Sequence, residues 1–269
     1  MLRDDSFPAP RPVYMDSSAT TPVAPEVLGA MLPYFGEVFA NASGAYSLGR
    51  QARRALEQAR ASVAGVLGWQ PEEIVFTSGG SEADNLALRG AARALRAAGR
   101  GSHLITSAIE HEAILATLHD LEAHEGFALT VLPVDDQGRV RVAEALAAVR
   151  PDTVLFSLML ANNEVGSLQP VAEIGARLRE RGILVHSDAV QAGAWLGLDV
   201  DRLNVDLLSL SAHKFYGPKG VGVLYIRQGT PLASCQTGGG HESGRRAGTE
   251  NVAGAVGLAT ALAMVQADR

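Results

Sequence analysis

The sequence contains very little lysine and almost no cysteine. Of its 23 lysine and arginine residues only two are lysine, Lys214 and Lys219, and they lie close together. Arginine can replace lysine wherever a positive charge suffices, but lysine alone can lose its proton and attack a carbonyl carbon. The lysine-containing segment is therefore a candidate for covalent chemistry, and two chance survivors of a composition bias are the alternative.

The single cysteine, Cys235, excludes a disulfide framework within the chain. The sequence has no Cys-x-x-Cys and no His-Glu-x-x-His pattern, so we expect no metal site. The formal net charge is -6, and the arginines are scattered rather than gathered in a basic run, which argues against a nucleic-acid partner. No apolar run approaches the roughly 20 residues that span a bilayer. Residues 1–6 contain no apolar signal core, so we expect a cytoplasmic protein without membrane contact.

Helical and strand-like patterns alternate along the chain. Apolar residues recur at helical spacing over residues 50–67, 82–98 and 113–124. Short apolar runs predict strands at residues 73–77, 103–106, 129–132, 153–158, 183–186, 207–210 and 222–226. Most connections are long enough for a helix, so we predict an α/β fold with a mostly parallel sheet and helices on both faces. Ligands of such sheets bind beyond the carboxyl ends of the strands, which makes the polar residues there the candidates for function.

The first two strand ends carry residues suited to a phosphate and to an aromatic ring. Gly80 and Ser81 open a helix, where exposed amides, a hydroxyl and the helix dipole favour an anion. An ordinary Gly-Ser turn with an N-cap would have the same sequence. His111 follows the next strand and could lie on a ring or move a proton, and a solvated histidine at a helix start is the simpler alternative.

Later strand ends complete a set of contacts. Asn162 and Asn163 could bind a phenolic or carboxylate oxygen, or they could only cap their own turn. A buried Asp188 needs a cation such as a protonated pyridine nitrogen, unless it is a helix N-cap. Lys214 would supply an amine to an aldehyde. Together with the phosphate cup and the histidine, these are the contacts that pyridoxal 5'-phosphate requires.

Seven motifs of the sequence lie at residues 14–22, 76–82, 109–111, 162–166, 188–191, 211–220 and 238–251. In their order and spacing, these motifs resemble the cysteine desulfurase family, a class V aminotransferase group within the fold-type I pyridoxal-phosphate enzymes. The glycine-rich motif at 238–251 resembles the branch that serves iron–sulfur cluster assembly and nitrogenase maturation. The resemblance implies pyridoxal 5'-phosphate as cofactor, L-cysteine as substrate, a homodimer, and an iron–sulfur scaffold or other sulfur acceptor protein as partner.

The resemblance also implies a role for each matched residue. Lys214 would form the Schiff base with the cofactor, Asp188 would bind its ring nitrogen, and His111 would stack on the ring and move protons. The other implied contacts are Asn163 and Gln191 for the phenolic oxygen, Gly80, Ser81, Ser211 and His213 for the phosphate, and Thr249 for the phosphate of the neighbouring subunit. Ser81 stands where most relatives have threonine. Lys219 has no implied chemical role and is interpreted as part of a turn.

The sequence also departs from the family. Family members continue through a loop whose cysteine takes the sulfur and through an arginine that binds the substrate carboxylate. We interpret this chain as truncated before that loop, and Cys235 as structural because it precedes the glycine-rich motif. Ala42 and Tyr46 stand where proline and histidine are usual, on the substrate side.

The predicted domains are an N-terminal arm at residues 1–15, a cofactor-binding large domain at 16–258 and the start of a C-terminal small domain at 259–269. The predicted function is that of a cysteine desulfurase, which converts L-cysteine to L-alanine and an enzyme persulfide. We expect the loop cysteine that carries the persulfide to be missing from this chain. Two alternatives remain. One is another class V enzyme, such as a selenocysteine lyase or a small amino-acid aminotransferase, and the other is a non-catalytic truncated subunit with a regulatory role.

Overall fold

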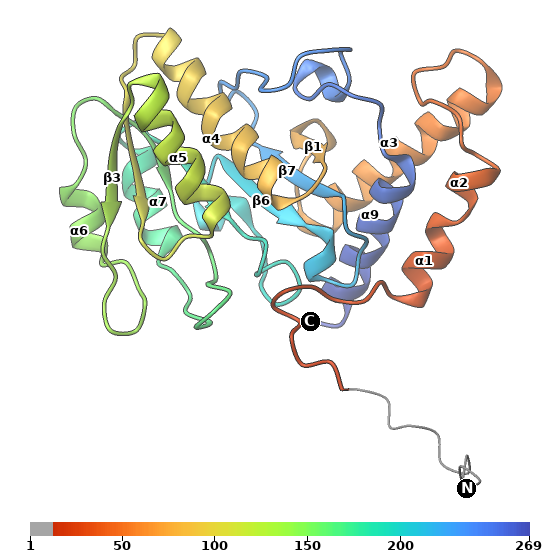
Figure 1. Cartoon of the computed structure of the whole chain (residues 1–269), viewed down its shortest axis with the longest axis horizontal. Helices are drawn as coiled ribbons and strands as arrows, with labels where there is room; N and C mark the ends of the chain where they lie inside the picture. Colours follow the sequence, from red (N-terminus) through yellow and green to blue (C-terminus); the bar gives the residue numbers. More distant parts are fainter. Residues whose placement is uncertain (1–12) are drawn as a thin grey trace, which may run out of the picture.

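The computed structural model describes residues 13–269, so most of the predicted N-terminal arm at residues 1–15 lies outside the described residues. One sheet runs through the molecule (Figure 1). Its strands are β1 (Ile74–Thr77), β2 (His103–Ser107), β3 (Ala128–Leu132), β4 (Thr153–Ser157), β5 (Leu184–Asp188), β6 (Leu207–Ser211) and β7 (Gly222–Ile226). All seven predicted strands are present, and their ends lie within two residues of the prediction.

The strand order is β1-β7-β6-β5-β4-β2-β3. Strand β7 is antiparallel to both of its neighbours, β1 and β6, and the remaining pairs are parallel. The reversal of β7 follows from its short connection to β6, which contains residues 212–221 and only one turn of 3₁₀ helix, η2 (Ala212–Lys214). The prediction of a mostly parallel sheet is confirmed.

Helices cover both faces of this sheet. They are α1 (Pro25–Met31), α2 (Pro33–Gly36), α3 (Ser47–Leu67), α4 (Gly80–Ala97), α5 (Glu112–Glu125), α6 (Val142–Ala147), α7 (Val171–Arg179), α8 (Val200–Leu203) and α9 (Val252–Ala267), with 3₁₀ turns η1 (Pro71–Glu73) and η3 (Glu242–Gly244). Helices α4 and α5 lie side by side in front of the sheet in Figure 1, and α7 lies behind it. Helix α9 packs between α3 and α1 at the other end of the molecule.

Most strands are mainly apolar because both of their faces are buried, and the edge strand β3 is the most exposed of the seven. Successive side chains of a strand point to opposite faces, so Leu104 packs under α4 and α5 whereas Ile105 packs into the core that contains α3, α7 and α9. Leu155 and Phe156 divide in the same way. Two hydrophobic cores therefore sandwich the sheet, and polar side chains inside the strands stand out as exceptions that need an explanation.

Helix α9 is apolar on all sides, which fits its burial between other helices. Its N-cap, Asn251, accepts a hydrogen bond from the Gly254 amide at 2.9 Å. The helix runs without a break past residue 258, where the large domain was predicted to end, and that domain division stays a prediction. Within residues 13–269 the structure contains no helix that is both long and apolar enough to cross a bilayer.

Candidate active site

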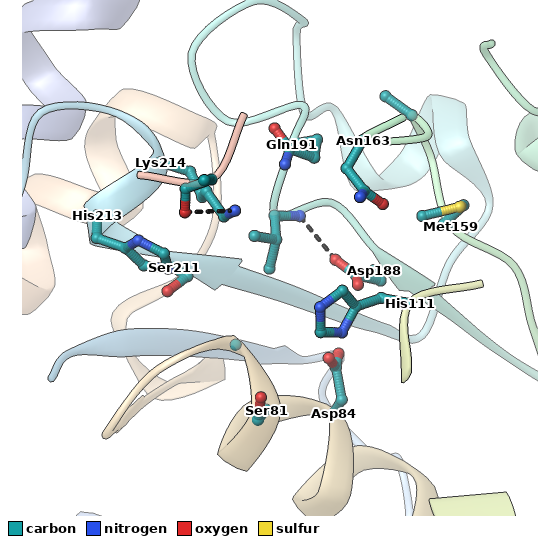
Figure 2. A pocket seen from close by; sticks show the side chains of 14 residues that line it. Ser81, Asp84, His111, Met159, Asn163, Asp188, Gln191, Ser211, His213 and Lys214 are labelled. Carbon is teal, nitrogen blue, oxygen red and sulfur yellow. Dashed lines mark hydrogen bonds between the residues drawn. The ribbon is translucent and has the colours of Figure 1, made fainter. Parts of the chain in front are cut away.

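A cavity of about 260 Å³ lies at the carboxyl ends of β5 and β6, beside the first turn of α4 (Figure 2). Nine of the ten site residues predicted from the sequence line it, namely Gly80, Ser81, His111, Asn163, Asp188, Gln191, Ser211, His213 and Lys214. The tenth, Thr249, lines a separate cavity of about 100 Å³ together with Ser78 and Arg246. The strand-end argument thus identified a set of residues that the fold brings together.

Lys214 ends the η2 turn that follows β6, and its side chain is partly buried. Its Nζ donates hydrogen bonds to the carbonyl oxygens of Ser18 and Ala19, and Ala19 also lines the cavity. Burial lowers the pKa of Lys214, and the nearby carboxylates, Asp188 among them, offset this only in part. The amine is therefore easier to deprotonate than an exposed lysine, as a nucleophilic lysine requires.

Asp188 is the last residue of β5 and is buried, with 6% of its surface exposed. Its Oδ1 accepts a hydrogen bond from the Val190 amide at 2.8 Å, so Asp188 does cap the turn that follows β5. No residue in 13–269 donates a hydrogen bond to Oδ2. Burial raises the pKa of Asp188, and the charges of His111 and Lys214 offset this only in part. A cation that entered the cavity would therefore stabilise the ionised form of this carboxyl group.

Two further buried carboxyl groups stand near Asp188, and the sequence analysis assigned a role to neither. Asp84 lines the cavity from α4, three residues after Ser81 and so on the same helix face. Glu110 accepts hydrogen bonds at Oε1 from the Ser107 hydroxyl at 2.7 Å and the Met159 amide at 2.9 Å. Asp84 Oδ1 and Glu110 Oε2 are buried without a hydrogen-bond partner among the described residues.

The charge of Asp188 affects the pKa values of the other two acids. Burial, followed by the charge of Asp188, raises the pKa of Asp84 well above its usual range. Burial also raises the pKa of Glu110 to about 8. Asp84, Glu110 and Asp188 cannot all carry a negative charge in a buried site without a large cost in free energy. A positive charge bound beside them would lower that cost. A cationic ligand group is the natural complement.

A chain of polar side chains continues from Asp84 beneath α4. His186 on β5 lies 2.9 Å from the Ser157 hydroxyl through Nδ1 and 3.0 Å from the Ser209 hydroxyl through Nε2. Asp84 Oδ1 is 3.6 Å from His186 Nε2. Burial lowers the pKa of His186 to about 3, so this pair is not a salt bridge at neutral pH. The hydrogen bonds of Ser157, His186 and Ser209 thus join β4, β5 and β6 next to Asp84.

The opposite end of the cavity is suited to an anion. Helix α4 begins at Gly80, and its N-cap Gly79 has φ of +150°, a conformation that residues with a side chain rarely adopt. A Cβ on Gly222 of β7 would lie 2.7 Å from the Gly79 carbonyl carbon, so only glycine lets the strand pass this close. The first-turn amides and the Ser81 and Ser211 hydroxyls therefore surround an open space at a helix N-terminus.

His111 caps the N-terminus of α5 through Nδ1, which accepts a hydrogen bond from the Ala113 amide at 3.1 Å. The neutral ring then carries its proton on Nε2. Asn162 is buried and caps its own turn, accepting at Oδ1 from the Glu164 and Val165 amides at 2.9 and 2.8 Å. Asn162 therefore caps its turn, whereas Asn163 lines the cavity and is placed to contact a ligand.

Gln191 donates through Nε2 to the Ser18 carbonyl at 2.9 Å, which ties it to the same segment that Lys214 contacts. His213 Nδ1 lies 3.0 Å from the Thr20 hydroxyl. Lys219, which was interpreted as part of a turn, lines a neighbouring space together with Gly80 and Ser211. Cys235 lies outside the lining of the 260 Å³ cavity, and partial burial raises the pKa of its thiol, which disfavours the reactive thiolate.

Residues 13–268 match the family described as Aminotransferase class-V. The chain belongs to this family. Among curated class-V relatives, the cysteine desulfurase IscS of Clostridium botulinum strain Hall is 51% identical over 250 residues, which cover 93% of this chain and 62% of the relative. The cysteine desulfurase IscS of Methanosarcina thermophila is 51% identical over 256 residues, covering 95% and 63%. The chain spans less than two thirds of the length of these relatives.

Solved structures agree with this assignment. A NifS-like protein matches with a TM-score of 0.91 and 42% identity, over 94% of this chain and 69% of that one. SspA, solved in complex with cysteine, matches with a TM-score of 0.88 and 42% identity, over 93% and 72%. The resemblance to the cysteine desulfurase group of the class-V family and the fold-type I architecture, both predicted from the sequence, are confirmed.

Class-V aminotransferases use pyridoxal 5'-phosphate, and the residues of this cavity fit that cofactor. The charges of His111 and Lys214 offset the burial of Asp188 only in part, and a protonated ring nitrogen would add the positive charge that is missing. The glycine-lined helix N-terminus offers free amides and hydroxyls for the phosphate. Lys214 presents an amine of lowered pKa between these two ends. The carboxylate, the helix N-terminus and the amine thus each match one chemical group of the cofactor.

Proposed function

We propose that this chain carries the cofactor-binding region of a pyridoxal-phosphate-dependent cysteine desulfurase. Its reaction would convert L-cysteine and an acceptor thiol to L-alanine and a persulfide on that thiol, for use in iron–sulfur cluster assembly. The observation that carries the proposal is the presence of Lys214 and Asp188 in one cavity, with a helix N-terminus on its far side. The family match and the relatives named as cysteine desulfurases support the choice of substrate and reaction.

The cavity residues would divide the binding of the cofactor. Asp188 would accept a hydrogen bond from the ring nitrogen at Oδ2 and would be ionised by its charge. The side-chain amides of Asn163 and Gln191 would orient the ring through its phenolic oxygen, and His111 would cover one ring face. The phosphate would lie against Gly80, Ser81, Ser211 and His213 at the start of α4.

The same residues would handle the protons of the reaction. When bound, pyridoxal 5'-phosphate supplies an electron-withdrawing ring that stabilises negative charge at the substrate α-carbon. The Lys214 amine would take the proton from that carbon, because its lowered pKa makes the neutral form accessible. His111, whose Nε2 is free to exchange a proton, would serve the sulfur-leaving step. The sulfur-accepting thiol would reach the cavity from outside the described residues, since Cys235 does not line it.

The first experiment adds pyridoxal 5'-phosphate to the purified protein and records its visible absorption. We expect a chromophore that borohydride reduces and that is absent from Lys214→Ala. The matched control is Lys219→Ala, which removes the only other lysine of the chain and should retain the borohydride-reducible linkage. A reducible chromophore that survives in Lys214→Ala would contradict the proposal.

The second experiment measures L-alanine formed from L-cysteine, with dithiothreitol as the thiol acceptor. A desulfurase forms alanine and sulfide without an added keto acid, whereas an aminotransferase requires one as amino acceptor. A chain that binds the cofactor but forms alanine from cysteine only when pyruvate is added would be an aminotransferase, and one that forms none would fit the regulatory alternative.

We also propose that the chain forms a homodimer in which Thr249 serves the phosphate site of a second copy. Thr249 lines a cavity separate from that of Lys214 within one chain, as a residue with a partner's site would. Thr249→Ala should weaken cofactor binding, and mixing it with Lys214→Ala should restore one intact site per mixed dimer. Failure of the mixture to bind more tightly than either variant would contradict this arrangement. The cytoplasmic location stays a prediction.

A further inference from the structure

A carboxylate borders the proposed phosphate end of the cavity and should repel a phosphate there. Glu82 lies in the first turn of α4, next to Ser81, and lines the same open space as Gly80 and Ser211. Its Oε2 accepts a hydrogen bond from the Ser78 amide at 2.8 Å, which caps the helix from within. A phosphate group bound at this helix N-terminus would therefore lie near a fixed negative charge.

Arg246 makes the strongest contact with that carboxylate. Its Nε donates to Glu82 Oε1 at 2.7 Å and its Nη2 donates to Oε2 at 3.2 Å, a two-point ion pair. Both side chains are mostly covered, with 20% and 23% exposed, so bulk water screens the pair only in part. Burial acts to raise the pKa of Glu82, but the hydrogen bonds from Arg246 and Ser78 outweigh it and keep the pKa below its usual value.

The other acids near Arg246 already have their own partners. Glu242 accepts both terminal nitrogens of Arg60, at 2.9 and 2.8 Å, and Glu250 lies 2.8 Å from His241. Arg246 is therefore committed to Glu82 rather than shared among three carboxylates. Its charge cancels that of Glu82 at the place where the proposed site takes a phosphate.

We propose that Arg246 is a positioning residue that neutralises Glu82 and so lets the start of α4 accept the phosphate of the cofactor. This inference rests on the proposed function, since it concerns the same cofactor site. In the absence of Arg246, Glu82 would still cap the helix through Ser78, but its charge would face the phosphate uncompensated. The loss should then fall on phosphorylated ligands and spare those without a phosphate.

The test is a titration of the protein with pyridoxal 5'-phosphate and, separately, with pyridoxal, which lacks the phosphate. For Arg246→Gln we expect the dissociation constant of pyridoxal 5'-phosphate to rise by on the order of tenfold. This is the effect expected of the uncompensated Glu82 charge at a partly covered site. The dissociation constant of pyridoxal, which has no phosphate to be repelled, should change by less than about twofold. Arg246→Lys, which keeps the charge, should behave like the unchanged protein.

The double variant decides between charge and structure. Arg246 also stands three residues before Thr249, so its removal could act by loosening that loop. Replacing Glu82 as well, in Glu82→Gln/Arg246→Gln, removes the uncompensated charge but not the loosened loop, and we expect it to recover most of the lost phosphate affinity. Arg93→Gln is the control, because Arg93, further along α4, makes a similar two-point pair with Glu125 of α5.

Three results would overturn the inference. They are an equal loss of affinity for both ligands in Arg246→Gln, no loss for either, or no recovery in the double variant. If the unchanged protein binds neither ligand, the proposed function fails first, and the two failures are thereby distinguished.

Discussion

The buried Glu110 makes a quantitative prediction about stability. The residue is 7% exposed, and its carboxyl group accepts two hydrogen bonds at Oε1 and has no partner at Oε2 among the described residues. Burial raises its pKa from 4.5 to about 8, so between these values the folded protein holds a proton that the unfolded chain has released. Raising the pH through this window therefore favours the unfolded chain.

The slope follows from proton linkage. One proton bound only by the folded state costs about 1.4 kcal/mol of unfolding free energy for each pH unit. In Glu110→Gln the amide keeps the shape and the acceptor oxygen but cannot ionise. The variant should thus gain about 1.4 kcal/mol per pH unit relative to the unchanged protein from about pH 5 to 7.5, with no further gain well above pH 8.

Urea unfolding of the cofactor-free protein at pH 5, 6, 7 and 8 measures this difference, because linear extrapolation gives the free energy at each pH. Glu112→Gln, which removes an exposed carboxyl group two residues away, controls for the change in charge. A stability difference between Glu110→Gln and the unchanged protein that does not vary with pH would refute the reasoning. A difference that shrinks as the pH rises would refute it equally.

Three further outcomes are expected. Burial lowers the pKa of His186 from 6.5 to about 3, so stability should fall by about 1.4 kcal/mol per pH unit as the pH drops through this window, and His186→Asn should remove that acid-side loss in an acid-unfolding titration. Arg60→Gln leaves the buried Glu242 carboxylate with the Phe76 amide as its remaining donor, and should cost about 3–5 kcal/mol in urea unfolding, against less than about 1 kcal/mol for the exposed Arg53→Gln. Cys235→Ser should leave the affinity for pyridoxal 5'-phosphate unchanged in a binding titration, since Cys235 does not line the cavity.

The strands could be predicted from the sequence because both faces of most of the sheet are buried, which makes most strands short, mainly apolar runs. The site residues could be predicted because the carboxyl ends of parallel strands share one edge, as Asp188 and Lys214 illustrate. The reversed direction of β7 depends on how the η2 turn folds back, and no periodicity in the sequence encodes it.

Two of the residues that the sequence did not reveal, Asp84 and His186, lie inside regular elements, whereas Glu110 lies in the loop between β2 and α5. Asp84 is one of several polar residues on α4, so only its spacing of three from Ser81 pointed toward the cavity. Ser157, His186 and Ser209 join only because strand register places them side by side, and register is not readable from one strand alone. The pairing of Glu82 with Arg246 likewise requires the folded chain.

The most direct test of the cofactor site is to load the protein with pyridoxal 5'-phosphate, reduce it with borohydride and locate the modified residue by peptide mass spectrometry. The account predicts a phosphopyridoxyl group on Lys214, with Lys219 unmodified, and a loss of the modification when Asp188→Ala or Arg246→Gln lowers the occupancy at limiting cofactor. Modification of Lys219 in place of Lys214, or labelling of both lysines to the same extent, would contradict it.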